Sequence, residues 1–243
     1  MVLRKFFLET RGKICSASLS PNFFSLYPAH MPAKQNYQQQ LETIIKEISL
    51  SEKKPTLLLH ACCGPCSSYV MEYLAGIFNI TIYYYNPNIH PKEEYDRRLA
   101  ELKKFVTSFP PAVQTGISVI EDSYNPEDFF EATNVRQEID LQTESEKGER
   151  CRRCYLFRMQ RAWNYATQHN FDFFTTTLSI SPHKDEEKIN TIGLSLVSEN
   201  NLKYLPADFK KKNGYLRSLQ LSKEYGLYRQ DYCGCIYSRQ QTH

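Results

Sequence analysis

The sequence predicts an α/β fold: a mostly parallel, doubly wound sheet of about five strands flanked by helices. Short apolar runs with strand character alternate along the chain with longer segments of helical periodicity. Parallel neighbouring strands need crossover connections, and this alternation supplies them. The composition, 41% hydrophobic and 23% charged residues, is typical of a globular protein. No apolar run reaches the roughly 18 residues of a membrane span, so we expect no membrane association.

The chain divides into an extension and one domain. We interpret residues 1–35 as a poorly ordered N-terminal extension and residues 36–243 as a single α/β catalytic domain, because 243 residues suit one well-packed domain better than two. The first thirty residues lack the sustained apolar segment of a secretion signal. We therefore expect a cytoplasmic protein.

Strands and helices alternate in the first half of the domain. The predicted elements are a helix over 37–48, a strand over 56–60, a helix over 69–78, a strand over 80–86, a helix over 95–106 and a strand over 114–122. The first strand, TLLLH, is a continuous apolar run of the kind buried on both faces of a parallel sheet. The segments CCGPCSS and NPNIHP are predicted to be the loops after the first two strands.

The second half continues the alternation. Its predicted elements are helices over 125–139 and 151–170, a strand over 171–180 and a helix near 183–200. In a parallel, doubly wound sheet, functional loops lie at the carboxyl ends of the strands. The loops CCGPCSS, NPNIHP and ISPHKD all belong to that edge, where we expect the chemistry and where His60, His90 and His183 are expected to hydrogen-bond or to position substrate.

Several nucleotide-binding motifs are absent. The chain contains neither GxxxxGK[ST] nor GxGxxG, and no two glycines are adjacent, which argues against ATP or NAD binding by those motifs. Cys62 and Cys66 begin a Cys-x3-Cys-x2-Cys pattern, but position 69 is Tyr. A radical enzyme of the type that carries that pattern is therefore not predicted.

Seven of the eight cysteines fall into three tight groups. The groups are Cys62, Cys63 and Cys66; Cys151 and Cys154; and Cys233 and Cys235. Without a secretion signal, such grouping indicates metal or redox chemistry in a reducing compartment rather than a disulfide framework. The first two groups together supply enough sulfur for a four-thiolate site.

Iron-sulfur and zinc compete for that site. A zinc site would use two Cys-x2-Cys pairs, but 84 residues separate Cys66 from Cys151, against roughly 15 to 20 in zinc ribbons. A zinc site built from these two pairs would also assign no role to Cys62. An iron-sulfur cluster accepts adjacent cysteines and distant pairs, so the spacing favours it while zinc stays open. Positive charge at Arg150, Arg152 and Arg153 would stabilise thiolates, or pair with the acidic residues before it.

Only Gly234 separates Cys233 from Cys235. A disulfide across one residue would close a tight ring, and strained disulfides are easily reduced, which favours a redox role. The alternative is two unpaired thiols in a packed segment.

Charge is unevenly distributed along the chain. The net charge is +3, but residues 201–243 carry eight Lys and Arg against three Asp and Glu, whereas residues 51–200 carry 16 against 21. The basic segment, which includes Lys210, Lys211 and Lys212, could follow a phosphate backbone or could form a solvated face.

Five segments together resemble the QueH type of epoxyqueuosine reductase. They are HACCGPCSS, YYYNPNIHPKEEYDRRL, RCRRCYLFRM, TTTLSISPHKD and YRQDYCGCIYSR, which occur in the family's order within about residues 36–240. The resemblance implies reduction of epoxyqueuosine to queuosine at the wobble position of tRNA, the last step of queuosine synthesis. It also implies a fold similar to the adenine-nucleotide α-hydrolase-like group.

The same resemblance implies the cofactor and the partners. The implied site residues are Cys62, Cys63, Cys151 and Cys154 as ligands of a 4Fe-4S cluster, Cys233 and Cys235 as a redox-active pair, and Cys66 at the position of an additional metal ion, iron, beside the cluster. The implied partners are tRNA containing epoxyqueuosine and an electron donor that the sequence does not identify. Two alternatives remain: a zinc-stabilised RNA-binding module, and a tRNA sulfur transferase, which would need an ATP-binding loop that the sequence lacks.

Overall fold

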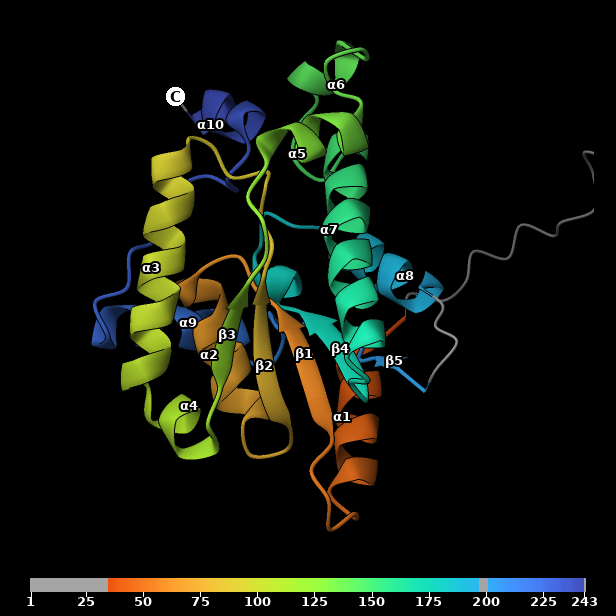
Figure 1. The fold of residues 1–243 in the computed structure, drawn as a ribbon, viewed down its shortest axis with the longest axis vertical. Coiled ribbons are helices and arrows are strands. Elements are labelled where there is room, and N and C mark those ends of the chain that lie inside the picture. Colours follow the sequence, from red (N-terminus) through yellow and green to blue (C-terminus); the bar gives the residue numbers. More distant parts are fainter. Residues whose placement is uncertain (1–34, 197–200, 243) are drawn as a thin grey trace, which may run out of the picture. The chain divides into compact units, whose positions relative to one another are not determined.

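A five-stranded, all-parallel sheet organises the computed structural model, which describes residues 35–196 and 201–242 (Figure 1). The strands are β1 (Thr56–His60), β2 (Asn79–Tyr84), β3 (Ser118–Glu121), β4 (Phe173–Thr176) and β5 (Lys203–Tyr204). The predicted extension over residues 1–35 lies, except for Gln35, outside the described residues, and so does the end of the segment 183–200.

The strand order β3-β2-β1-β4-β5 makes the sheet doubly wound, which confirms the predicted fold class. The central strand β1 pairs in parallel with β2 on one side and with β4 on the other. The order therefore reverses between β1 and β4, and the loops after these two strands diverge. Ligands of such sheets bind in the crevice at this switch point.

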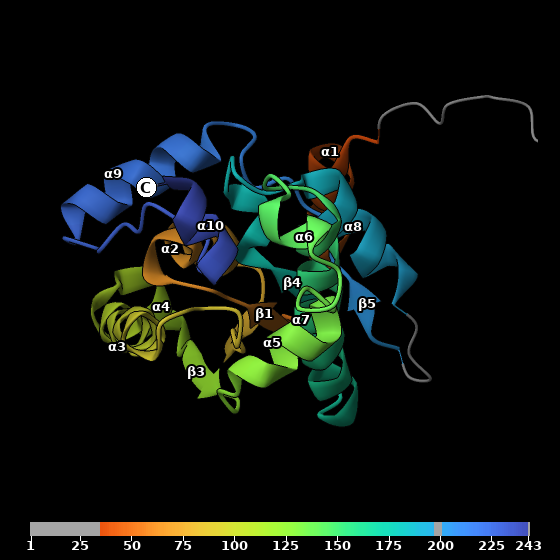
Figure 2. The same cartoon turned by 90° about the horizontal axis from the view of Figure 1, so that it is seen from above.

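Helices cover both faces of the sheet (Figure 1). One face is covered by α1 (Tyr37–Ile48), α2 (Gly64–Leu74), α3 (Lys92–Ser108), α4 (Pro110–Thr115) and α9 (Gly214–Glu224), and the other by α7 (Glu149–Gln168) and α8 (Glu186–Ser195). Seen from above in Figure 2, the short helices α5 (Pro126–Thr133), α6 (Asp140–Thr143) and α10 (Ile236–Thr242) lie over the carboxyl ends of the strands. None of the helices in residues 35–196 and 201–242 is long and apolar enough to cross a bilayer.

Strand β1 shows why its sequence is a continuous apolar run. Leu57 and Leu59 are fully buried in the cluster that contains α2 and α3. Leu58 points to the opposite face, where it is fully buried in the cluster that contains α7. Successive side chains alternate across a strand, so a strand covered on both faces needs apolar residues at every position.

Helix α2 begins five residues earlier than predicted. Cys63 is its N-cap, with extended backbone (φ −171°, ψ 165°), and its sulfur accepts a hydrogen bond from the Cys66 amide at 3.4 Å. Pro65 occupies the first turn, where its missing amide hydrogen costs no hydrogen bond. The predicted loop CCGPCSS is therefore short, and Cys66 lies within the first turn of a helix.

Other boundaries also differ from the predicted ones. The predicted strand over 171–180 ends at Thr176, whose hydroxyl accepts from the Leu178 amide and starts a 3-10 turn, η1 (Thr177–Ile180). The predicted helix over 125–139 ends at Thr133, and Asn134 after it is in the left-handed conformation (φ 54°). Strand β5 and helices α4, α9 and α10 were not located from the sequence.

Candidate metal and redox site

Three thiols converge where β1 ends. Cys62 and Cys63 come soon after the strand, and Cys66 lies in the first turn of α2. Their three sulfur atoms lie within 4.8 Å of one another, and the Cys62 and Cys63 sulfurs are 3.8 Å apart. Metal-sulfur bonds of about 2.3 Å in tetrahedral geometry place two sulfurs roughly 3.8 Å apart. The three thiols are thus spaced as ligands of a metal.

The three thiols differ in pKa. Sulfur hydrogen bonds with Cys63 and Cys66 hold the pKa of Cys62 well below its usual value. The same interaction with Cys62 raises the pKa of Cys63 to about 12, and it raises the pKa of Cys66 as well. Of the three thiols, Cys62 therefore ionises most readily. A metal would displace the remaining protons.

The second cysteine pair lies on the first two turns of α7. The Glu144 carboxylate accepts hydrogen bonds from the amides of Glu149 and Arg150, both at 2.7 Å, and so holds the start of this helix. Burial, together with the neighbouring Cys233 thiol, raises the pKa of Cys151 to about 12. Cys154 is buried, and burial raises its pKa also.

Two buried cations face the thiols. Arg158 of α7 and Lys184, which lies after η1, are 1% and 5% exposed. Arg158 donates to the Asn86 side-chain oxygen and approaches the Cys154 sulfur at 4.0 Å. Its Nε atom has no hydrogen-bond partner among the residues that the structure describes. Within residues 35–196 and 201–242, neither cation forms an ion pair with a carboxylate.

The charge of both cations is stabilised by sulfur. Burial alone would lower the pKa of Lys184, but the nearby thiols, those of Cys233 and Cys62 most strongly, raise it above its usual value. Burial opposes the charge of Arg158 as well, but the thiols of Cys154 and Cys62 offset it and raise its pKa. A buried cation needs a compensating anion. The crevice therefore fits an anionic set of thiolates around a metal centre.

The segment Cys233–Gly234–Cys235 is tied to the loop after β2. Gly234 has φ 132°, and a Cβ atom there would lie 3.0 Å from the Ile89 side chain. Its carbonyl accepts from the His90 amide at 2.8 Å, and the buried Arg98 donates to the Cys233 carbonyl at 3.1 Å. Glycine is required here by both the backbone conformation and the close approach.

The two thiols of this segment differ in environment. Cys233 is partly exposed, whereas the Cys235 sulfur is buried and accepts from the Ser238 amide at 3.4 Å. Both are free thiols in this structure, as are the other cysteines among the described residues. Burial, with Cys233 as the next cause, raises the pKa of Cys235 above its usual value.

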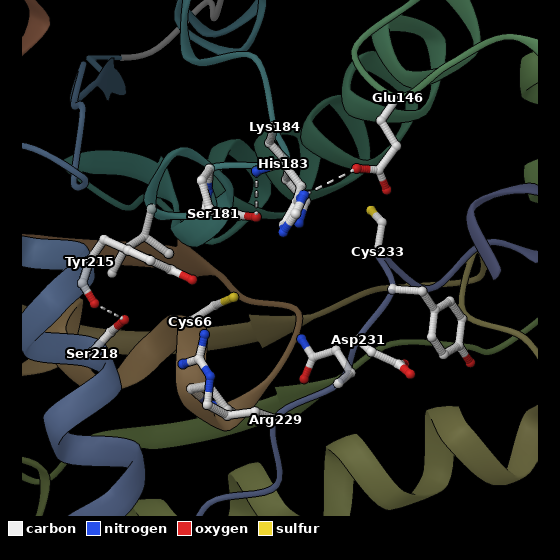
Figure 3. Close-up of a pocket in the computed structure, with 15 residues that line it drawn as sticks. Cys66, Glu146, Ser181, His183, Lys184, Tyr215, Ser218, Arg229, Asp231 and Cys233 are labelled. Carbon is white, nitrogen blue, oxygen red and sulfur yellow. Dashed lines mark hydrogen bonds and ion pairs between the residues drawn. The ribbon is translucent and has the colours of Figure 1, made fainter. Parts of the chain in front are cut away.

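A pocket of about 180 Å³ opens beside these thiols. Figure 3 shows Cys66 and Cys233 on different walls of it, with Glu146 and His183 nearby. Its lining comprises Pro65, Cys66, Glu146, Ile180, Ser181, Pro182, His183, Lys184, Tyr215, Ser218, Arg229, Gln230, Asp231, Tyr232 and Cys233. The pocket is a candidate substrate site because two thiols and several polar groups converge on it.

Several functional candidates gave no separate signal in the sequence. Gln230 donates from Nε2 to the Cys63 sulfur at 3.1 Å, and Arg158 and Lys184 supply the buried charge. All three lie in segments that carried the family resemblance, but their residue types gave no separate signal. Glu146 lies outside those segments, and nothing in the sequence distinguishes it from its acidic neighbours.

The three histidines at this edge play different parts. His60 is fully buried, with Nδ1 2.8 Å from the Thr176 hydroxyl and Nε2 3.2 Å from the Tyr85 carbonyl, and burial lowers its pKa to about 3. It is a neutral hydrogen-bonding residue that ties β1 to β4. His90 packs against Phe129 and Phe130. Of the three, His183 is the one that lines the pocket.

The basic C-terminal segment is partly neutralised within the fold. Its ion pairs are Lys210 with Glu186 at 3.0 Å and Asp208 at 3.2 Å, Lys212 with Glu42 at 2.5 Å, and Arg217 with Glu72 at 2.6 Å. Lys210 also donates to the Ser179 carbonyl. The excess of Lys and Arg in this segment therefore overstates the charge available to a phosphate backbone.

Comparison with known proteins identifies similar chains. A family model described as "Epoxyqueuosine reductase QueH" matches residues 57–241. A protein named epoxyqueuosine reductase QueH from Streptococcus pyogenes serotype M1 is 40% identical over 205 residues, which are 84% of this chain and 78% of that protein. Proteins of the same name from Staphylococcus epidermidis and Thermotoga maritima are 38% and 34% identical, over 84% and 75% of this chain and 85% and 90% of their own lengths.

Proposed function

This chain belongs to the epoxyqueuosine reductase QueH family, and we propose that its catalytic domain, residues 36–243, uses a 4Fe-4S cluster at the switch point of the sheet. The protein is an oxidoreductase, an epoxyqueuosine reductase of tRNA processing and queuosine biosynthesis. We place the modified base at the wobble position of the tRNA, and the enzyme in the cytoplasm with an electron donor still to be identified.

The proposed cluster ligands are Cys62, Cys63, Cys151 and Cys154. One observation supports this proposal: Arg158 and Lys184 are buried without a carboxylate partner in the described part of the chain. Cys154 and Cys62 stabilise the charge of Arg158, and Cys233 and Cys62 stabilise that of Lys184. A cluster held by four thiolates would supply the negative charge that these cations need. Cys66, beside the first pair and on the pocket wall, is the proposed ligand of an additional iron.

Reduction of the epoxide to an alkene consumes two electrons and two protons and releases water. The cluster, when bound, supplies electrons singly. The protein residues have separate tasks. Arg158 and Lys184 balance the charge of the thiolates, and Gln230 donates a hydrogen bond to the Cys63 sulfur. Oxidation of the Cys233 and Cys235 thiols to a disulfide would release two electrons and two protons, which matches the stoichiometry.

The alternative functions lack support of this kind. A zinc-stabilised RNA-binding module and a tRNA sulfur transferase are not favoured by the family relationship. Zinc also carries no electrons, and the reduction requires two.

Anaerobic purification followed by iron, sulfide and zinc analysis tests the cofactor. We expect four irons in a Mössbauer-detectable cluster, which Cys63→Ala loses and the control Cys15→Ala, outside the three cysteine groups, retains. A colourless zinc protein, or a full cluster in Cys63→Ala, would refute the ligand assignment. Nucleoside analysis of tRNA from cells lacking the protein tests the reaction, with epoxyqueuosine expected to accumulate.

A further inference from the structure

The reaction needs a proton for the departing epoxide oxygen, and the structure excludes several of the residues that could donate it. Apart from Lys184 and the thiols that the proposed function assigns to metal and redox roles, four residues near the active edge are candidates: His60, His183, Asp185 and Asp231. His60 is excluded because both of its ring nitrogens are hydrogen-bonded in the core. The role of this proton rests on the proposed function, since epoxide reduction is the reaction that consumes it.

The two aspartates are also unsuited to donate a proton. Asp185 is the N-cap of α8, where its Oδ1 atom accepts from the Glu187 amide at 3.1 Å and the Lys188 amide at 3.0 Å. Its other oxygen lies 3.3 Å from the Lys188 ammonium. Asp231 is exposed at the pocket rim, and no hydrogen bond or ion pair among the described residues orients its carboxylate. His183 is the remaining candidate.

Lys184 carries a proton in the same pocket, but its place indicates another task. It is 5% exposed and faces thiols, which stabilise its ammonium form. A strongly held proton makes a weak general acid, because efficiency is greatest when the pKa lies near the operating pH. Lys184 therefore suits a fixed positive charge rather than a group that gives up its proton in each turnover.

A carboxylate lies within ion-pair distance of His183. Its Nδ1 atom lies 3.6 Å from a carboxylate oxygen of Glu146, and both residues line the pocket (Figure 3). With Nδ1 directed at Glu146, the Nε2 side of the ring is left for a substrate. A base or acid whose distal nitrogen is held by a carboxylate is the arrangement used for proton transfer by histidine in many enzymes.

Glu146 is itself fixed by the redox segment. The Ser238 hydroxyl donates to its other carboxylate oxygen at 2.6 Å, and the same hydroxyl accepts from the Cys233 amide at 3.1 Å. A continuous chain of contacts thus runs from Cys233 through Ser238 and Glu146 to His183. These contacts hold the Glu146 carboxylate in place, and they join the His183 imidazole and Cys233 at the same pocket.

We propose that His183 is the general acid of the reaction and that Glu146 is its positioning residue. The imidazolium transfers the Nε2 proton to the epoxide oxygen as its carbon-oxygen bonds break, and becomes neutral imidazole. The reductase activity supplies the two electrons that form the carbon-carbon double bond. Solvent reprotonates the ring, and a second proton completes the departing water.

Other charged and titratable groups act on the same ring. Those facing the pocket are Cys66 from α2, Glu146 from the loop before α7, Lys184 from the loop that carries His183, and Arg229, Asp231 and Cys233 from the C-terminal segment. Only Glu146 lies within ion-pair distance of His183 among the described residues. Its removal should therefore change the titration of the ring most directly.

The test compares His183→Gln with wild type and with His169→Gln, a control at the C-terminal end of α7 that stacks on Tyr165. We expect His183→Gln to lower kcat by roughly 10²- to 10⁴-fold, with the KM for tRNA and the iron content unchanged. Because the acid acts protonated, wild-type kcat should fall as the pH rises through the histidine titration. His183→Gln should lose this decrease of kcat at high pH, and His169→Gln should keep it.

Glu146→Gln gives an independent readout. Loss of the carboxylate disfavours the imidazolium, so the alkaline limb of kcat should move to lower pH while iron content stays constant. Full kcat with an unchanged pH profile in His183→Gln would overturn the proposal, as would an unshifted limb in Glu146→Gln. Failure of the wild-type enzyme to form queuosine would instead refute the proposed function, so the two failures are distinguishable.

Discussion

Arg158 and Lys184 constrain the chemistry more than any cysteine considered alone. A thiol packs readily in an apolar interior, so a buried cysteine has an ordinary structural explanation. A buried cation needs compensating polar groups, because desolvation of a charge is costly. Arg150 finds backbone carbonyls, whereas Arg158 and Lys184 face thiols. Because these two cations are buried beside the thiols, the site requires negative charge.

Lys184→Met tests this charge balance at the residue scale. Removal of the ammonium should destabilise the reduced, more negative cluster and lower its reduction potential. The sign of this shift follows from the attraction between the ammonium and the added electron. Potentiometric titration followed by electron paramagnetic resonance measures it. Lys188→Met, a variant of a partly exposed lysine, should leave the potential unchanged, and an unshifted potential in Lys184→Met would contradict this role of Lys184.

At the scale of elements, contacts between neighbouring strands and helices hold the active edge. Asp122, directly after β3, accepts hydrogen bonds from Tyr83 of β2 and from Arg161 of α7, the latter at 2.7 Å. Burial opposes its ionisation, but the bonds from Arg161 and Tyr83 lower its pKa to about 2. One carboxylate therefore joins three elements below the loops of the site.

This network predicts a pH dependence of stability. The folded-state pKa of Asp122 is about 2, below the roughly 3.9 of an unfolded chain, so its contribution is present above pH 4 and lost as the pH falls towards 2. Asp122→Asn should lower the free energy of unfolding at pH 7, and the difference from wild type should close near pH 2. Urea unfolding at both pH values measures this. If the free energies of unfolding of Asp122→Asn and wild type differed equally at pH 7 and pH 2, the stabilisation by Asp122 would come from hydrogen bonding rather than from charge.

The backbone conformation of Gly234 leads to a second prediction at the scale of elements. Ala would meet Ile89 at 3.0 Å and would adopt φ 132°, a conformation that side chains rarely tolerate. We expect Gly234→Ala to destabilise the protein by about 1–3 kcal/mol and to expose residues 228–242 to hydrogen exchange. Gly76→Ala is the control, because no atom lies within 4 Å of its added Cβ. Unchanged exchange in Gly234→Ala would contradict the docking of this segment through Gly234.

At the scale of the whole domain, tRNA binding depends on which cations form no ion pair with a carboxylate among the described residues. The sequence suggested Lys210, Lys211 and Lys212 together, but Lys210 and Lys212 form ion pairs within the fold. Arg229, exposed at the pocket and packed beside Tyr215, is better placed to contact a phosphate near the modified base.

Salt dependence of tRNA affinity distinguishes these lysines and arginines. Arg229→Ala should weaken binding and reduce the slope of log K against log salt by about 1, the value for one lost phosphate contact. Lys212→Ala, which breaks the ion pair with Glu42, is the comparison and should leave the slope nearly constant. The same slope for Arg229→Ala and wild type would remove this residue from the tRNA interface.

The sequence by itself determined the fold class, the loops that carry the chemistry and the family. Alternation of apolar runs with helical periodicity is a local property, and the motifs are contiguous, so both can be recognised without tertiary contacts. The boundaries of α2 and β4 were misplaced because they depend on single capping groups, the Cys63 sulfur and the Thr176 hydroxyl. Strand β5 has only two residues and left no periodic signal.

Only the tertiary structure decided which residues share the site. Cys63 and Gln230 lie 167 positions apart yet form a hydrogen bond, and Glu146 reaches both Ser238 and His183. Burial of Arg158 and Lys184 likewise depends on packing around the switch point rather than on their neighbours in the chain. Contacts between distant segments and the desolvation of a charge are properties of the folded chain, and for that reason the pattern of residue types predicted the thiols but not the groups that balance and orient them.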